Sequence, residues 1–313
     1  MVKNSKSSGK SARKRSNKPF YIVMFLLIIV VPASIYFLNE QSKPKSQKSE
    51  GKQENPYEEN TPEYYDWKAT RSLAPLAEDM KQVPSPYKFI KSGIDKVEEY
   101  CWQALDLDTT FTPCWERLGY IYAFMHGKQA LLVEKTYADK GMEDEALTQK
   151  ARVAENFVKA NFYYDKALEF GTKDSAGVYY QKAAAAKLLD HYDHVALNLQ
   201  KAFALKPGNK KYEMELIEAY LYAGRYNNAL SQNEQFHKKY PNHEFYYRTL
   251  GGYYTFLGEE EAGVFYYEKA AELGSKPEVS MLLHKHFQDL GDTAQAAYYL
   301  KKVQEARTSY QPE

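Results

Sequence analysis

Residues 247–270 of this 313-residue chain have the sequence YRTLGGYYTFLGEEEAGVFYYEKA. Aromatic, aliphatic and small side chains recur there every three or four residues on both sides of Gly258, which is the spacing of one face of an α-helix. Gly258 stands where a first helix would end, since glycine readily adopts the left-handed conformation common at that position. The segment therefore predicts two short helices joined by a tight turn.

The same pattern repeats with a period of 34 residues through the C-terminal half of the chain. The matched positions are Pro207 with Pro241, Asp190 with Gly224 and Gly258, Val195 with Ala229 and Gly263, and Ala202 with Phe236 and Ala270. Two helices of about 12 to 14 residues with short turns fill this period. Because one such pair cannot cover its own apolar face, we expect successive pairs to stack into an all-α solenoid, with Gly224, Gly258 and Gly291 in turns.

The spacing of the signature positions resembles that of the tetratricopeptide repeat (TPR) family. The best match is the set Tyr247, Leu250, Gly251, Tyr254, Gly263, Tyr267 and Ala270. An earlier unit supplies the same pattern with Trp115, Leu118, Gly119, Tyr122, Ala160, Tyr164 and Ala167. The resemblance implies a right-handed TPR superhelix, an α-solenoid of antiparallel helix pairs that serves to bind other proteins.

We expect this solenoid to occupy residues 61–309. Thr61 is a suitable helix cap, and Pro62 fits the first turn of a helix that we expect to be interrupted near Pro75. The unit at 115–170 is 29 residues too long, because 38 positions separate Tyr122 from Ala160 where other units need 9. The surplus predicts a long helical hairpin that turns near residue 140. It is either a longer structural pair or a docking finger for a partner.

The N-terminal region predicts a membrane anchor. Residues 1–19 form a basic tail with seven Lys or Arg and no acid, and Phe20 to Leu38 contain no charge. Nineteen helical residues span about 28 Å, close to the thickness of the hydrocarbon core. The positive-inside rule places the N-terminus in the cytoplasm, so we expect a single-pass signal-anchor in the inner membrane and a periplasmic TPR domain. A cleavable signal peptide ending at Ala33 is the alternative.

Charge and motifs exclude several other classes of protein. Residues 39–60 are polar and predict a disordered linker. After residue 19 the chain holds 35 basic and 41 acidic residues. This balance argues against nucleic acid as a partner. The sequence contains no catalytic or nucleotide-binding motif, so we expect no enzyme activity and no small-molecule cofactor. His191 and His194 fall in a predicted turn, and we expect no metal site there.

Cys101 and Cys114 are the only two cysteines, and they lie on either side of a predicted turn. An exported location would permit a disulfide between them. A buried, reduced pair is the alternative, since free cysteine is common in protein cores. The sequence does not choose between the two.

The resemblance implies a concave groove lined by the first helix of each pair. The matching positions are Tyr120, Phe124, Tyr180, Ala184, Leu188, Met214, Glu218, Tyr222, Arg248 and Phe256. This mainly aromatic and apolar set suits a peptide held by stacked rings, with Glu218 and Arg248 adding polarity. We therefore expect a membrane-anchored scaffold or adaptor that binds a protein or peptide. The alternatives are a periplasmic holding chaperone or assembly factor, as in cytochrome c maturation, and a glycan-binding accessory of a cell-wall enzyme.

Overall fold

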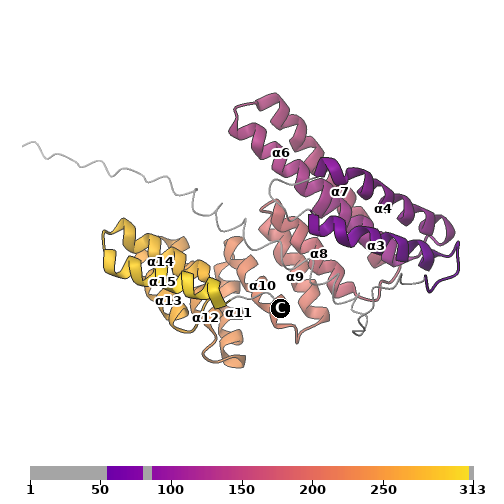
Figure 1. Cartoon of the computed structure of the whole chain (residues 1–313). Coiled ribbons are helices and arrows are strands. Elements are labelled where there is room, and N and C mark those ends of the chain that lie inside the picture. The colour runs from indigo at the N-terminus through magenta and orange to yellow at the C-terminus, as the bar shows by residue number, and fades with distance from the viewer. Residues whose placement is uncertain (1–54, 80–86, 310–313) are drawn as a thin grey trace, which may run out of the picture.

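The computed structural model describes residues 55–79 and 87–309, and its regular elements there are all helices (Figure 1). Their bounds are α3 Pro62–Asp79, α4 Tyr87–Leu107, α5 Thr112–Tyr120, η1 Ile121–Gly127, α6 Lys128–Asp139, α7 Glu143–Glu169, α8 Ser175–Leu188, α9 Tyr192–Leu205, α10 Lys210–Tyr222, α11 Tyr226–Lys239, α12 Glu244–Leu257, α13 Glu260–Glu272, α14 Pro277–Asp289 and α15 Thr293–Ser309. The all-α architecture expected from the sequence is confirmed for these residues.

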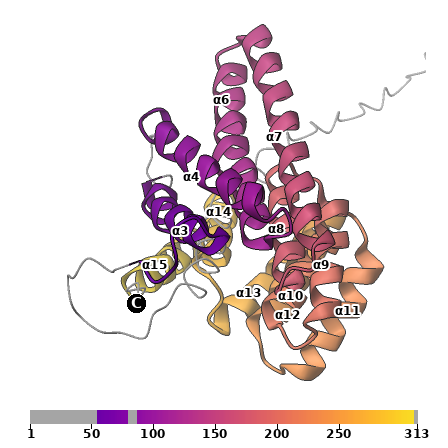
Figure 2. The same cartoon turned by 90° about the vertical axis from the view of Figure 1, so that its right-hand side faces the viewer.

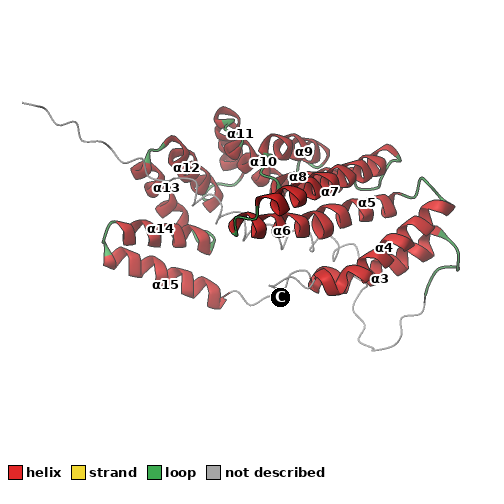
Figure 3. Ribbon diagram, turned by 90° about the horizontal axis from the view of Figure 1, so that it is seen from above, coloured by secondary structure: helices red, strands yellow, loops and turns green. Residues whose placement is uncertain are grey.

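The helices form antiparallel pairs that follow one another along a curved path. The pair α3 and α4 lies at one end and the pair α14 and α15 at the other (Figures 1 and 3). Buried apolar residues form successive clusters shared by neighbouring pairs, in place of a single central core. This arrangement follows from the 34-residue period, because each pair covers the apolar face of the next.

The predicted turn glycines end helices in the left-handed conformation. Gly224, Gly258 and Gly291 have φ angles of 71°, 80° and 78°, and Asp190 at the matching position has 56°. A side chain with a Cβ is disfavoured in this region, which explains the recurrence of glycine.

Close approach within a pair depends on glycine at a second position. A Cβ on Gly251 would lie 2.6 Å from the ring of Tyr267, and a Cβ on Gly119 would lie 2.6 Å from the ring of Tyr164. The two units use the same contact, although 132 residues separate the two glycines. A tyrosine on the second helix thus fills the space that the missing side chain leaves on the first.

The surplus residues of the long unit form a helical hairpin that projects from the rest of the molecule (Figure 2). One arm runs without a break from α5 through η1 into α6, and the other is α7, with the turn at residues 140–142. The seven-residue π-helix η1 departs from the regular α-helix expected there. Gly127 lies at its end, where a Cβ would approach the Tyr122 carbonyl oxygen to 2.7 Å and the Phe157 ring to 3.0 Å. The wider π turn therefore coincides with tight packing against α7.

The expected interruption at Pro75 is wrong, because α3 continues through this residue to Asp79. Thr61 caps the helix as predicted, with its hydroxyl accepting a hydrogen bond from the Tyr64 amide at 3.2 Å. Buried Ala69, Leu73 and Ala77 lie before and after the proline on the same face. Their packing offsets the loss of one backbone hydrogen bond.

The predicted membrane segment Phe20–Leu38, the basic tail and most of the linker lie outside the described residues. Within residues 55–79 and 87–309, no helix combines the length and the apolar character that a bilayer crossing requires.

Cys101 and Cys114 are both buried and are not joined by a disulfide. Their thiols lie within hydrogen-bond distance, beside Arg117, whose guanidinium binds Asp66 on α3. The hydrogen bond with Cys101 and burial both raise the pKa of the Cys114 thiol. Of the two alternatives from the sequence, the structure shows the reduced pair.

Candidate binding face on the first helices

The first helices of three successive pairs lie beside one another. The rings of Tyr180 on α8 and Tyr212 on α10 stack with centroids 5.0 Å apart. The rings of Tyr222 on α10 and Phe256 on α12 meet edge to face at 5.6 Å. The first contact is buried and holds α8 against α10, whereas the second is half-buried between α10 and α12. We call the adjoining sides of α8, α10 and α12 the first-helix face.

A partly buried ion pair lies on this face. Arg248 on α12 donates a hydrogen bond of 2.7 Å to Glu218 on α10, and its Nε lies 3.4 Å from a carboxylate oxygen of Glu244. Only 15% of the Arg248 side chain and 19% of the Glu218 side chain are exposed. Glu244 stands one helical turn before Arg248, so both can reach the same space.

Further charged groups extend this pair into a network. The Tyr180 hydroxyl donates a hydrogen bond of 2.9 Å to Glu215, one turn before Glu218. Lys187 on α8 is close enough to favour the ionised forms of both glutamates. Lys276, at the start of α14, acts in the same way on Glu218 and Glu244. We call these residues the charge network: Lys187, Glu215, Glu218, Glu244, Arg248 and Lys276.

The three carboxyl groups of the network respond differently to burial. Burial acts to raise the pKa of Glu218, but Arg248 and Lys187 outweigh it and the pKa is lowered. Burial raises the pKa of Glu215 and of Glu244 in spite of nearby cations. Glu218 is therefore the carboxylate held most firmly in its charged form, because it directly accepts the hydrogen bond of Arg248.

Aromatic rings flank the network. Tyr222 and Phe256 are half-buried, and the Tyr222 ring also stacks on Tyr192 of α9 with centroids 4.9 Å apart. Burial, followed by the negative charge of Glu218, raises the pKa of Tyr222, so its hydroxyl keeps its proton at neutral pH. Fixed charges beside partly exposed rings can bind a segment that carries both polar and apolar side chains.

The structure brings together four of the ten residues that the sequence assigned to a groove, namely Glu218, Tyr222, Arg248 and Phe256. Tyr180 adjoins them through Glu215 but is itself buried.

The other five lie elsewhere. Tyr120 and Phe124 are buried against each other in the core around the hairpin, and burial raises the pKa of Tyr120 to about 12. Ala184 and Leu188 are half-buried against that same core, and Met214 packs with the cluster around Phe236. Helical spacing placed them on the first helices, but packing with neighbouring helices decided which side chains are covered.

Sequence reasoning missed Lys187, Glu215, Glu244 and Lys276. A signal was present, because Glu215 and Glu218 are three residues apart in an apolar helix, and Glu244 and Arg248 are four apart. Such pairs share a helix face. The partners across helices could be found only from the packing.

No group of three or more metal-ligating side chains occurs among the residues that the structure describes. The rings of His191 and His194 lie 6.1 Å apart at the start of α9. Tyr192 lies between them in the sequence, and its hydroxyl is 3.5 Å from a carboxylate oxygen of Asp190.

Stacked pairs of antiparallel helices define this chain as a helical-repeat protein. No family model matches its sequence, and no curated protein matches it. Solved structures with a similar helical arrangement include YrrB, described as a TPR protein with an unusual peptide-binding site. It is 17% identical, and the match covers 74% of this chain and 99% of YrrB with a TM-score of 0.40.

PilF from Pseudomonas aeruginosa is 14% identical over 80% of this chain and 93% of PilF, with a TM-score of 0.44. A tetratricopeptide repeat protein from Parabacteroides merdae is 15% identical over 78% of this chain and 98% of its own, with a TM-score of 0.33. At TM-scores below 0.5, none of these likenesses assigns a ligand or a function to this chain.

Proposed function

We propose that this chain is a membrane-anchored adaptor whose first-helix face binds a segment of a partner protein. One observation carries the proposal: three successive first helices join partly buried charges and half-buried rings on one face. Groups that are already fixed in place lose little conformational freedom when a ligand binds. The ion pair Glu218–Arg248 would make this surface selective. A partner side chain whose charge does not match the neighbouring group would bind less favourably there.

The partner class follows from the shape of this surface. Side chains on successive parallel helices form a row, which suits an extended or helical segment more than a compact small molecule. The rings of Tyr222 and Phe256 would hold apolar side chains, and the charge network would fix the register.

Photocrosslinking in cells tests the binding face. A photoreactive phenylalanine analogue replaces Phe256 in one variant and Leu197, an exposed residue on α9, in a control. We expect a defined adduct from position 256, none from position 197, and loss of the adduct when Glu218→Lys is added. Equal adducts from both positions would refute the binding face. A broad smear of products at position 256 would favour the holding chaperone instead.

The location is tested separately. The charge-free stretch Phe20–Leu38 after seven basic residues supports an anchor with the repeats outside the cytoplasm. Alkaline phosphatase fused after Glu313 should be active in that case. An inactive fusion of full length would contradict the periplasmic location without affecting the binding face.

A further inference from the structure

An open cavity of about 500 Å³, lined mainly by polar residues, lies between α4 and the base of the hairpin, apart from the first-helix face. The side chains of Lys91, Asp95 and Glu155 in its walls are more than half exposed. Each of four helical segments turns polar side chains toward it. The lining residues are Lys91, Asp95 and Glu98 of α4, Tyr122 and His126 of η1, Gln129, Ala130 and Val133 of α6, and Gln149, Arg152, Glu155, Asn156 and Lys159 of α7. Like the charge network on the first-helix face, this lining contrasts with the apolar clusters that join most of the described helix pairs.

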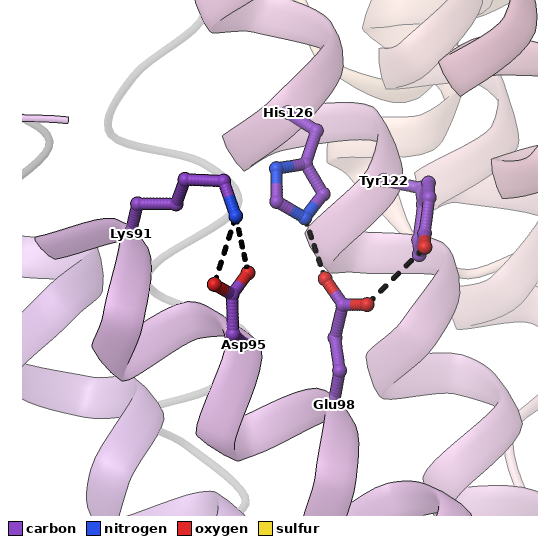
Figure 4. Close-up of polar contacts among 5 residues, drawn as sticks. All are labelled: Lys91, Asp95, Glu98, Tyr122 and His126. Carbon is purple, nitrogen blue, oxygen red and sulfur yellow. Dashed lines mark hydrogen bonds and ion pairs between the residues drawn. The ribbon is translucent and has the colours of Figure 1, made fainter. Parts of the chain in front are cut away.

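The α4 side of the cavity carries an organised carboxylate (Figure 4). Glu98 binds His126 Nε2 at 2.5 Å and accepts a hydrogen bond from the Tyr122 hydroxyl at 3.2 Å. Burial, then the charge of Glu98, raises the pKa of Tyr122, so the phenol keeps the proton that it donates. One turn before Glu98 on α4, Asp95 binds Lys91 through both of its carboxylate oxygens at 2.8 Å. With one lysine and two carboxylates, this wall carries one excess negative charge.

Both partners of Glu98 lie in η1. Tyr122 and His126 are four residues apart in η1, where the wider turn keeps them close together on one side. Their rings contact each other with centroids 5.1 Å apart. Both therefore reach the same glutamate.

The α7 wall has the opposite balance. Lys159 binds Glu155 at 2.7 Å, and its Nζ lies 5.4 Å from the centroid of the Tyr122 ring. Arg152 adds a second cation one turn earlier. With two cations and one carboxylate, this wall carries one excess positive charge, so the cavity is dipolar from α4 to α7.

We propose that this cavity binds a small zwitterion of the peptide class, a free amino acid or a short peptide with both termini charged. Its ammonium group would lie toward Asp95 and Glu98, and its carboxylate toward Arg152 and Lys159. The Oε1 atom of Gln129, buried at the cavity without a hydrogen-bond partner, would accept an N–H of the ligand.

Size and charge argue against other ligand classes. A volume of about 500 Å³ lies in the range typical of small-molecule sites, about 300 to 1,000 Å³. The carboxylates of Asp95 and Glu98 would repel a nucleotide or another polyanion, while the cations of α7 would repel a metal ion. An apolar ligand would displace water from these charged side chains without offering them a hydrogen bond.

Calorimetric titration of the full chain in nonionic detergent with trialanine tests the proposal. Trialanine carries a charge at each terminus and has no charged side chain. We expect it to bind, and we expect N-acetyltrialanine and trialanine amide each to bind about tenfold more weakly or worse, because each has lost one charge-assisted contact. Acetylated trialanine amide, which lacks both charges, should not bind measurably.

Two variants locate the site. Arg152→Gln removes a cation of the cavity wall and should weaken trialanine about tenfold, whereas Lys150→Gln removes an exposed cation of the same helix outside the cavity and should have no effect. The proposal is overturned if trialanine does not bind at up to about 10 mM, if the capped peptide binds equally well, or if the two variants behave alike. Crosslinking at position 256 is independent of these results, so the adaptor proposal can fail or stand separately.

Discussion

Replacing Arg248 with methionine should destabilise the region around α10 and α12 more than a substitution of an exposed arginine does. Methionine keeps the length and apolar part of the side chain but removes its charge and its hydrogen bonds. Glu218 would lose the donor that now lies at 2.7 Å, and Glu244 would lose the cation that now lies at 3.4 Å. Two carboxylates would then remain side by side in a poorly hydrated place.

The structure sets the size of this effect. Removing one partner of a buried ion pair costs about 3 to 5 kcal/mol, because the other charge is left without compensation. The side chains of Arg248 and Glu218 are 15% and 19% exposed, so some water reaches them. We therefore expect the free energy of unfolding to fall by about 3 kcal/mol at pH 7, at the lower end of that range.

The effect should depend on pH with a defined sign. In the natural chain the pKa of Glu218 is lowered, so its ionised form stabilises the fold above the ordinary pKa of about 4.3 and loses that effect as the pH falls through the folded pKa. Without Arg248, burial would instead raise the pKa of Glu218. The Arg248→Met variant should then take up a proton on Glu218 as the pH falls, and its deficit should be smaller at pH 4 than at pH 7.

Urea unfolding followed by circular dichroism at both pH values measures the deficit, and hydrogen exchange of α10 and α12 shows where it arises. Arg225→Met is the matched control, because Arg225 binds Asp193 with both side chains largely exposed and should cost less than about 1 kcal/mol. Adding Glu218→Gln to Arg248→Met should recover part of the loss. Equal losses for the two arginine variants, or a deficit that does not shrink at pH 4, would refute the reasoning.

Two further predictions concern the packing of helices. Gly251→Ala should lower the free energy of unfolding by about 1 to 3 kcal/mol, because its methyl group meets the Tyr267 ring, whereas Gly208→Ala, with no atom within 4 Å, should be nearly neutral in the same urea assay. Cys114 should resist alkylation by iodoacetamide in the folded chain at pH 7 and react in urea, since it is buried and its pKa is raised. Cys101 has a lowered pKa and should be protected by its burial alone; rapid labelling of Cys114 in the folded chain, followed by mass spectrometry, would contradict this.

The sequence predicted the helix pairs because their determinants are local. Gly224, Gly258 and Gly291 mark turns through a backbone property that needs no partner, and the caps and period set the helix lengths. The predicted interruption at Pro75 was wrong because packing, not a local property, decides the outcome there. The local effect of this proline favours a break, but packing of Leu73 and Ala77 on α4 keeps the helix intact.

The candidate binding face was predicted only in part. Helical spacing placed Phe124 and Tyr222 at equivalent positions, yet the first is buried in the core around the hairpin and the second is half-buried beside Phe256. Which of them is covered depends on the neighbouring helices, because the long hairpin packs over the first and not over the second. Spacing along one helix does not contain that information.

By itself the sequence determined that this protein is an array of paired helices, since a 34-residue period with small residues at fixed positions leaves each pair dependent on the next. The charge network and the dipolar cavity were decided only by the tertiary structure. Glu218 and Arg248 are 30 residues apart, and Glu98 and His126 are 28 apart, so neither contact follows from helical spacing. Each exists because stacking brings separate helices within hydrogen-bond distance, where low exposure to water makes their charges interact strongly.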